Sequence, residues 1–216
     1  MRLDGMTDRA IVRVLLAAEL GHLAAGEPPE RAAISRSADE AVALAKLPIQ
    51  ERLALVTERE IETVLSGYLS ALEAECATGA FVTQPGIAQL LPRLAEEKTV
   101  LLGLCTGNLE RGAELKLKST NLWHHFSFGG YGSDAEPRPE IVKKAWERAQ
   151  ARGAKSALVI DDTPRGVLAA HEAGLPACGV ATGRWSTRDL GVHGAQRVVE
   201  SFADLEGSLG ILLGPL

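Results

Sequence analysis

The sequence predicts an α/β protein in which a parallel sheet follows a smaller helical domain. Its 216 residues, with 46% hydrophobic and 24% charged side chains, suffice for a folded core of one large domain or two small ones. Up to about residue 80, apolar residues recur every three or four positions. Beyond residue 81, short apolar runs alternate with helical stretches, which is typical of a parallel sheet. We therefore expect a helical domain over 1–80 and an α/β domain over 81–216.

The helical domain is expected to begin with a helix over 8–23. Apolar side chains recur there at helical spacing, and Thr7 or Asp8 can cap its first turn. A break rich in glycine and proline ends this helix. The alanine-rich stretch 32–45 and the periodic stretch 58–75 predict further helices, which gives a small bundle.

Four strands and four helices are expected in the α/β domain. The strands are predicted at 99–104, 157–160, 177–180 and 197–199, and the helices at 87–97, 109–117, 141–152 and 165–173.

Composition excludes several classes of partner. The net charge of −5 gives no basic footprint for nucleic acid or an anionic membrane. Nothing resembles a signal peptide or a membrane span. The three cysteines, at positions 76, 105 and 178, form no closely spaced pair, which favours a reducing compartment. We expect a cytoplasmic protein, and the sequence gives no sign of its oligomeric state.

Ligands of parallel sheets bind at the carboxyl ends of the strands, and the first predicted strand ends in polar residues. Thr106, Gly107 and Asn108 follow it directly. A hydroxyl group and backbone N–H groups at such a turn can bind a phosphoryl group. The alternative is that Thr106 and Asn108 only cap the helix over 109–117.

The second predicted strand ends in two adjacent carboxylates, Asp161 and Asp162. Hard oxygen ligands of this kind suit Mg²⁺, which also retains water and substrate phosphate. The alternative is a helix cap, in which Asp162 or Thr163 precedes Pro164 at the first helical position. One cap needs only one such residue, so two adjacent acids favour the metal site.

Between these two strands, Arg138 lies in a proline-rich turn that opens the helix over 141–152. A guanidinium fixed there could neutralise a phosphate, and a solvated surface arginine is the alternative.

The order and spacing of these pieces resemble the haloacid dehalogenase (HAD) superfamily, most closely its phosphoglycolate-phosphatase-like branch. Residues 101–149 look like its second and third motifs, 157–190 like its fourth motif, and the helical half, from Leu3 onward, like its cap domain. The resemblance implies a Rossmann-like core and hydrolysis of a small phosphate monoester, such as phosphoglycolate or a sugar phosphate, through an aspartyl-phosphate.

The resemblance also implies roles for single residues. Thr106 and neighbouring N–H groups, including those of Gly107 and Asn108, would bind the phosphoryl group, and Asp162 would bind Mg²⁺, with Asp161 beside it. Arg138 would supply the basic group, for which the family often has lysine two positions earlier.

The sequence departs from this family in two places. The first is the attacking motif, a strand ending in Asp-x-Asp, because Asp4 and Asp8 have the wrong spacing. That strand would lie between those at 99–104 and 157–160, so two inner edges are expected to lack a partner, and a late start codon or a truncated gene would explain this. The second is Gly166, where the family usually has a second acid, for which Asp161 could compensate.

Three functions follow from this comparison. The first is a Mg²⁺-dependent phosphatase whose nucleophile is not present in this chain, so that the chain as given could be inactive. The second is a catalytically dead homologue that binds a phosphorylated ligand or a partner protein. A dehalogenase is the third, and the adjacent acids Asp161 and Asp162 argue against it.

Overall fold

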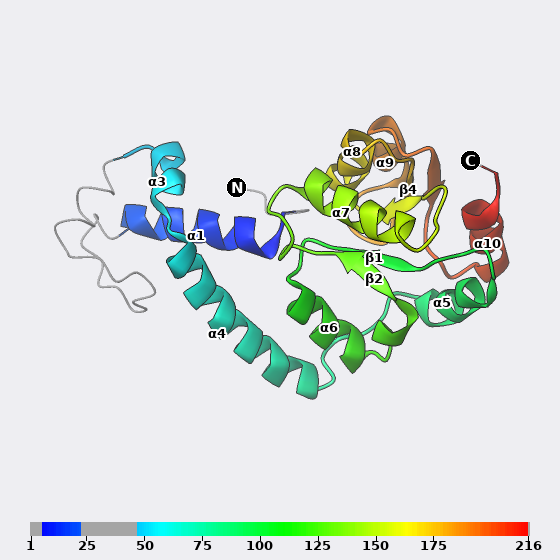
Figure 1. The fold of residues 1–216 in the computed structure, drawn as a ribbon, viewed down its shortest axis with the longest axis horizontal. Coiled ribbons are helices and arrows are strands. Elements are labelled where there is room, and N and C mark those ends of the chain that lie inside the picture. Colours follow the sequence, from blue (N-terminus) through cyan, green and yellow to red (C-terminus); the bar gives the residue numbers. More distant parts are fainter. Residues whose placement is uncertain (1–5, 23–46, 216) are drawn as a thin grey trace. The chain divides into compact units, whose positions relative to one another are not determined.

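The computed structural model describes residues 6–22 and 47–215, and Figure 1 traces the fold. The chain divides into two compact units. One is Asp8–Ala74, and the other joins Met1–Thr7 to Glu75–Leu216. The predicted boundary was residue 80. The helix expected over 32–45 lies outside the described residues.

The helical unit contains α1 (Asp8–His22), α3 (Ile49–Leu55) and most of α4 (Glu58–Ala77). The predictions of helices over 8–23 and 58–75 are confirmed to within two residues at each end. Helix α3 was not predicted, because seven residues are too few to establish a helical period.

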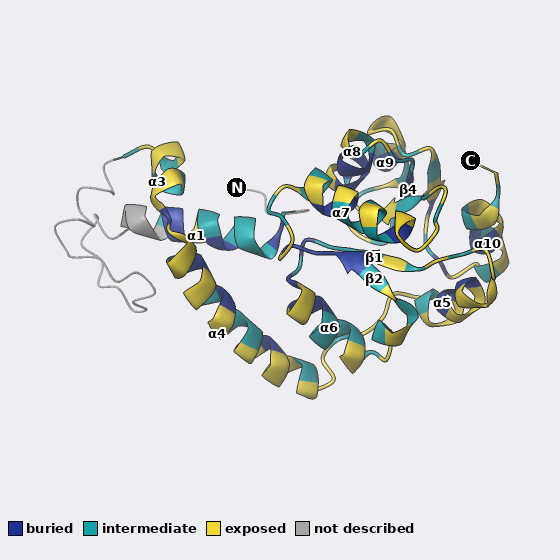
Figure 2. Cartoon of the chain, viewed as in Figure 1, coloured by how far each residue is buried: buried dark blue, intermediate teal, exposed yellow. Residues whose placement is uncertain are grey.

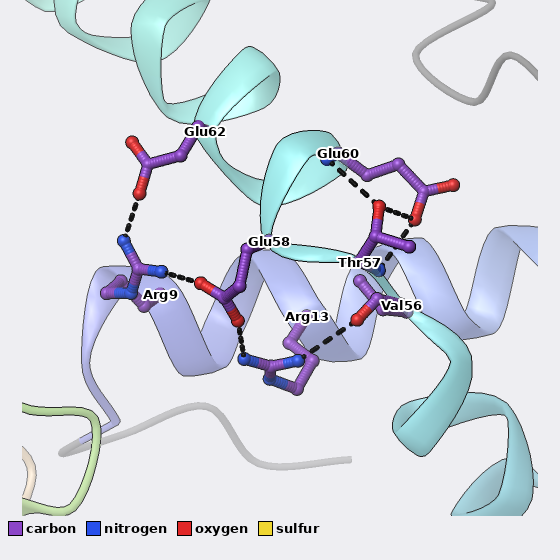
Figure 3. A network of polar contacts seen from close by, with 7 residues as sticks. All are labelled: Arg9, Arg13, Val56, Thr57, Glu58, Glu60 and Glu62. Carbon is purple, nitrogen blue, oxygen red and sulfur yellow. Dashed lines mark hydrogen bonds and ion pairs between the residues drawn. The ribbon is translucent and has the colours of Figure 1, made fainter.

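Two arginines of α1 connect this helix to the start of α4 (Figure 3). Arg9 pairs with Glu58 and Glu62, while Arg13 donates to Glu58 at 2.8 Å and to the carbonyl oxygen of Val56 at 3.2 Å. These arginines hold the pKa of Glu58 below its usual value, with the hydrogen bond from Arg13 the largest cause. The N-terminal turn of α4 is thereby fixed against α1.

In its described residues, the α/β unit contains five short strands in two parallel sheets. They are β1 (Gly103–Cys105), β2 (Phe128–Gly130), β3 (Val159–Asp161), β4 (Ala177–Val180) and β5 (Arg197–Val199). Strands β1 and β2 form one sheet, and β3, β4 and β5 form the other in that order. The expected α/β fold with parallel strands is therefore confirmed.

Within the described part of the chain, no strand pairs with the second edge of β1 or of β3. Two apolar side chains near these edges are exposed, Leu101 at 47% and Ile160 at 41%. The first predicted strand, 99–104, is largely wrong, because only 103–105 has a hydrogen-bonded neighbour. Strand β2 was missed because two of its three residues are glycines, which disfavour strands.

Helices connect and cover these strands. They are α5 (Ile87–Glu96), α6 (Glu110–Ser119), the 3₁₀ turn η2 (Trp123–His125), α7 (Arg138–Gln150), α8 (Pro164–Glu172), α9 (Thr187–Val192) and α10 (Leu205–Leu213). Helix α7 packs on β1, β2 and α8, while α8 packs on β3 and β4. The short helices α9 and α10 were not predicted.

Two clusters of buried side chains form the core of the three-stranded sheet. One contains Leu90, Val199 and Phe202, and the other joins Val167 of α8 to Leu190 of α9. Buried residues of α8 and β2 are dark blue in Figure 2. Each described helix is too short or too polar to cross a membrane.

Candidate functional site

The loop after β1 is held in place by its own backbone. The N–H group of Thr106 donates to the carbonyl oxygen of Gly130 at 3.0 Å, which extends the contact between β1 and β2. The N–H group of Asn108 donates to the hydroxyl oxygen of Thr106 at 3.2 Å. Gly132 then donates to the carbonyl oxygen of Asn108 at 2.7 Å, so the two turns hold each other.

The structure does not support the alternative in which Thr106 and Asn108 only cap the following helix. The N-cap of α6 is Leu109, whose side chain makes no capping bond. The first N–H group of the helix, on Glu110, instead donates to the hydroxyl oxygen of Ser133 at 3.2 Å. The cap therefore comes from the loop after β2.

The side chain of Asn108 has a partner that the sequence analysis missed. Lys116 of α6 donates from Nζ to Oδ1 of Asn108 at 3.0 Å. Asn108 lies two residues before α6, so no helical spacing links it to Lys116 and no local sequence pattern predicts this contact. Asn108 thus helps to fix the loop.

Arg138 is the first residue of α7 and reaches the end of β3. Its Nη2 donates to Oδ2 of Asp161 at 2.6 Å, and the two side chains are 20% and 11% exposed. A Cβ atom added at Gly107 would lie 3.2 Å from Nη1 of the same guanidinium. The solvated-surface alternative is wrong, because Arg138 is largely buried and lies between the ends of β1 and β3.

Asp161 is held by the turn that begins α8. Its Oδ1 accepts from the N–H and hydroxyl groups of Thr163, at 2.8 and 2.7 Å. The hydroxyl oxygen of Thr163 in turn accepts from the N–H group of Gly166 at 3.0 Å, with Pro164 as the first helical residue. The alternative that Thr163 is the cap is confirmed, and neither aspartate is needed for it.

Asp162 has different surroundings. It is exposed, and a Cβ atom added at Gly183 would lie 3.1 Å from its Oδ2. Partial desolvation of its carboxyl group, followed by repulsion from Asp161, raises the pKa of Asp162. A nearby cation would counteract both effects.

A divalent cation fits Asp162 better than Asp161. Asp162 offers an exposed hard oxygen ligand, whereas both oxygens of Asp161 already accept protein hydrogen bonds. Among the described residues, no three His, Cys, Asp or Glu side chains lie close enough to form a metal cluster. Mg²⁺ at Asp162 would therefore take most of its ligands from water, carbonyl groups and phosphate, as this ion commonly does.

Cys105, directly before Thr106, is not an activated nucleophile. Desolvation raises the pKa of its thiol to about 11, although the positive charge of Arg138 opposes this shift. The thiolate is the reactive form, and it is scarce at neutral pH with this pKa. Cys105 is therefore a packing residue beside the loop.

Three donors near the end of β1 have no acceptor among the described residues. They are the hydroxyl hydrogen of Thr106, the N–H group of Gly107 and Nη1 of Arg138. Gly107 is buried, and a Cβ atom added to it would lie 3.0 Å from the carbonyl oxygen of Met6 and 3.2 Å from Nη1 of Arg138. An N–H group, a hydroxyl and a guanidinium near the end of one strand are groups suited to the oxygens of an anion.

The comparisons with known proteins identify the family. Residues 30–180 match the family model of haloacid dehalogenase-like hydrolases, which is more than half of the chain. The chain belongs to the haloacid dehalogenase-like hydrolase family. The loop after β1, Arg138 and the end of β3 all lie within the matched region of this HAD-like chain.

One curated relative agrees with this assignment. The chain is 30% identical over 133 residues to "Probable phosphatase IndB" of Dickeya dadantii (strain 3937), which covers 60% of this chain and 56% of that protein. The HAD-like chain thus spans little more than half the length of this curated relative.

Solved structures support the fold. A hydrolase from Pseudomonas syringae matches with a TM-score of 0.57 and 22% identity, over 96% of this chain and 80% of that one. A β-phosphoglucomutase from Clostridium difficile matches with a TM-score of 0.55 and 18% identity, over 94% and 90%. At this level of identity the likeness shows a shared fold.

Proposed function

We propose that this HAD-like chain binds the phosphate group of a small phosphate monoester and belongs to a phosphatase that hydrolyses it. The observation that carries the proposal is a set of three donors, from Thr106, Gly107 and Arg138, that have no acceptor in the part of the chain that the structure describes. They lie where the carboxyl end of β1 meets the guanidinium. This is the edge at which parallel sheets bind ligands.

Each donor would have a distinct role toward the phosphate. The hydroxyl of Thr106 is fixed by its bond from Asn108 and can donate to one phosphate oxygen. The N–H group of Gly107 can donate to a second phosphate oxygen. Nη1 of Arg138 would offset the charge that grows on the phosphoryl oxygens during transfer.

The remaining assignments follow the family resemblance. Mg²⁺ at Asp162 would add positive charge against the phosphate oxygens. The helical unit, Asp8–Ala74, would be the cap domain that excludes water from the site. The attacking aspartate that the resemblance implies is not assigned to any residue of this chain. Small monoesters such as phosphoglycolate or sugar phosphates are the proposed substrates.

The test measures binding and turnover separately. Calorimetry with inorganic phosphate, with and without Mg²⁺, is expected to detect binding to the chain as given. Hydrolysis of p-nitrophenyl phosphate is then measured for this chain and for a form extended by any in-frame codons before Met1. Turnover only in the extended form would establish a phosphatase. Binding without turnover in either form would favour the catalytically dead homologue, and no binding would contradict the proposal.

A further inference from the structure

The side chain of Asp161 fills the space above Gly166. A Cβ atom added at Gly166 would lie 1.8 Å from Cγ of Asp161 and 2.1 Å from each of its carboxylate oxygens. Real atoms do not approach so closely, so no side chain at position 166 can coexist with the present position of Asp161. The two positions exclude each other.

Backbone geometry does not account for this glycine. Gly166 is the third residue of α8 and does not have a positive φ. Glycine inside a helix is less favourable than alanine by about 1 kcal/mol. The space needed by the Asp161 carboxylate is therefore the physical reason for glycine at this position.

The carboxylate in that space holds Arg138. Oδ1 of Asp161 is fixed by Thr163, which leaves Oδ2 directed at Nη2 of Arg138. With Nη2 engaged, Nη1 remains beside Gly107. The guanidinium group is planar and rigid, so it has few orientations once one nitrogen is held. By holding Nη2, Asp161 therefore restricts the position of Nη1.

We propose that Asp161 is a positioning residue for Arg138. We also propose that an aspartate at position 166 can hold Arg138 in the same way when residue 161 is glycine. This inference rests on the proposed function, because phosphate is taken as the ligand of Arg138. It adds Asp161 as a residue that affects phosphate binding through Arg138. A carboxylate introduced at position 166 would start less than 2 Å from the present Cγ of Asp161. It would also stand at the third helical position after Thr163, where an acid is favoured.

The experiment compares the parent with Asp161→Gly, Gly166→Asp and the double variant that carries both changes. Each single change is expected to weaken the affinity for inorganic phosphate about tenfold, a typical size for coupled neighbours. The first removes the carboxylate, and the second displaces it and adds a like charge. The double variant, which has the parent's net charge, is expected to bind within about threefold of the parent. A double variant as weak as the product of the two single losses would overturn the inference.

A second readout follows the guanidinium directly. In ¹H–¹⁵N spectra, a held arginine side chain gives separate Nη–H signals, which Arg138→Ala identifies. We expect these signals in the parent and the double variant, and their loss in Asp161→Gly. Signals unchanged in Asp161→Gly would overturn the positioning role even if phosphate binds. If no protein binds phosphate but the signals follow the expected pattern, the proposed function fails and the positioning role stands.

Two control variants separate orientation from charge and stability. Glu147→Gln removes one exposed carboxylate from α7, and Val167→Ala weakens the packing of α8 without touching Arg138. Both are expected to bind phosphate as the parent does below their unfolding temperatures. If Val167→Ala lost as much phosphate affinity as Asp161→Gly, the effect of Asp161 would be explained by stability alone. That result would overturn the inference.

Discussion

Arg148 and Asp134 form a two-point ion pair between α7 and the loop after β2. Nη1 of Arg148 lies 2.8 Å from Oδ2 of Asp134, and Nη2 lies 2.7 Å from Oδ1. Nη1 also donates to the carbonyl oxygen of Gly129 at 2.6 Å. Because this loop leads directly into Arg138, the pair helps to set where α7 begins.

The first prediction is that Arg148→Met lowers the free energy of unfolding by about 1 to 3 kcal/mol. Three hydrogen bonds to a charged group are lost, and partial exposure of the guanidinium reduces their value. Arg148→Lys should recover only part of this loss, since lysine cannot make the two-point contact. Urea unfolding measures both. Arg111→Met removes an exposed pair on α6 and should cost under about 1 kcal/mol; an equal cost would contradict the prediction.

The second prediction concerns Arg138 itself. Arg138→Ala should weaken the binding of inorganic phosphate at least about tenfold, because a charge-assisted donor is lost. Arg138→Lys should be intermediate, since one ammonium group cannot serve both Asp161 and the loop at Gly107. Calorimetry provides the measurement, with Arg111→Ala as the exposed control. Unchanged affinity in Arg138→Ala would remove Arg138 from the site.

The third prediction addresses the metal. Asp162→Asn keeps the shape of the side chain but removes the charge that attracts Mg²⁺. We expect Mg²⁺ to strengthen phosphate binding to the parent and to have little effect on this variant. Glu147→Gln, an exposed acid of α7, should respond to Mg²⁺ as the parent does. A full Mg²⁺ response in Asp162→Asn would place the metal elsewhere.

The fourth prediction is a loss of stability at high pH that depends on Cys178. This thiol is fully buried in β4, and desolvation raises its pKa from 9.0 to about 11. Between these values the unfolded chain loses the proton while the folded chain keeps it, so stability falls as pH rises through this window. Cys178 should contribute about 1 to 2 kcal/mol to the fall.

The variant Cys178→Ala tests whether Cys178 causes this fall in stability with rising pH. Urea unfolding of the parent and the variant at pH 8 and pH 11 gives the two differences to be compared. The variant is expected to lose less stability than the parent over this interval, because its buried position no longer titrates. An identical loss in the two proteins would mean that Cys178 does not contribute.

The sequence predicted those parts of the fold in which a local pattern is strong. The periodic stretches became α1, α4 and α8, and the apolar runs at 177–180 and 197–199 became β4 and β5 at the predicted residues. Helices α3 and α9 were missed because six or seven residues show no helical period, and β2 was missed because two of its three residues are glycines. The limits of β1 depended on its hydrogen-bonded neighbours, which no local pattern contains.

The candidate site was predictable as a set of residue types but not as a set of contacts. The strand-end rule selected Thr106, Asp161 and Asp162 correctly as neighbours of strand ends. It did not reveal that Asp161 would turn toward Arg138, because side-chain direction at the last residue of a strand depends on the following turn. The contacts of Lys116 and Ser133 depend on how the loops after β1 and β2 pack against α6, which no local pattern contains.

The division of the strands into two separate ladders also bears on cooperativity. In the described structure no backbone hydrogen bond of a ladder connects β1 to β3, so each sheet can open without first breaking the other. Amide protons of β1 and β2 should then exchange with solvent as one group, and those of β3, β4 and β5 as another. Packing of α7 on α8 and the contact between Arg138 and Asp161 join the two groups. An anion bound by both the loop after β1 and Arg138 would therefore link the two sheets. Its binding should slow the exchange of amide protons in both.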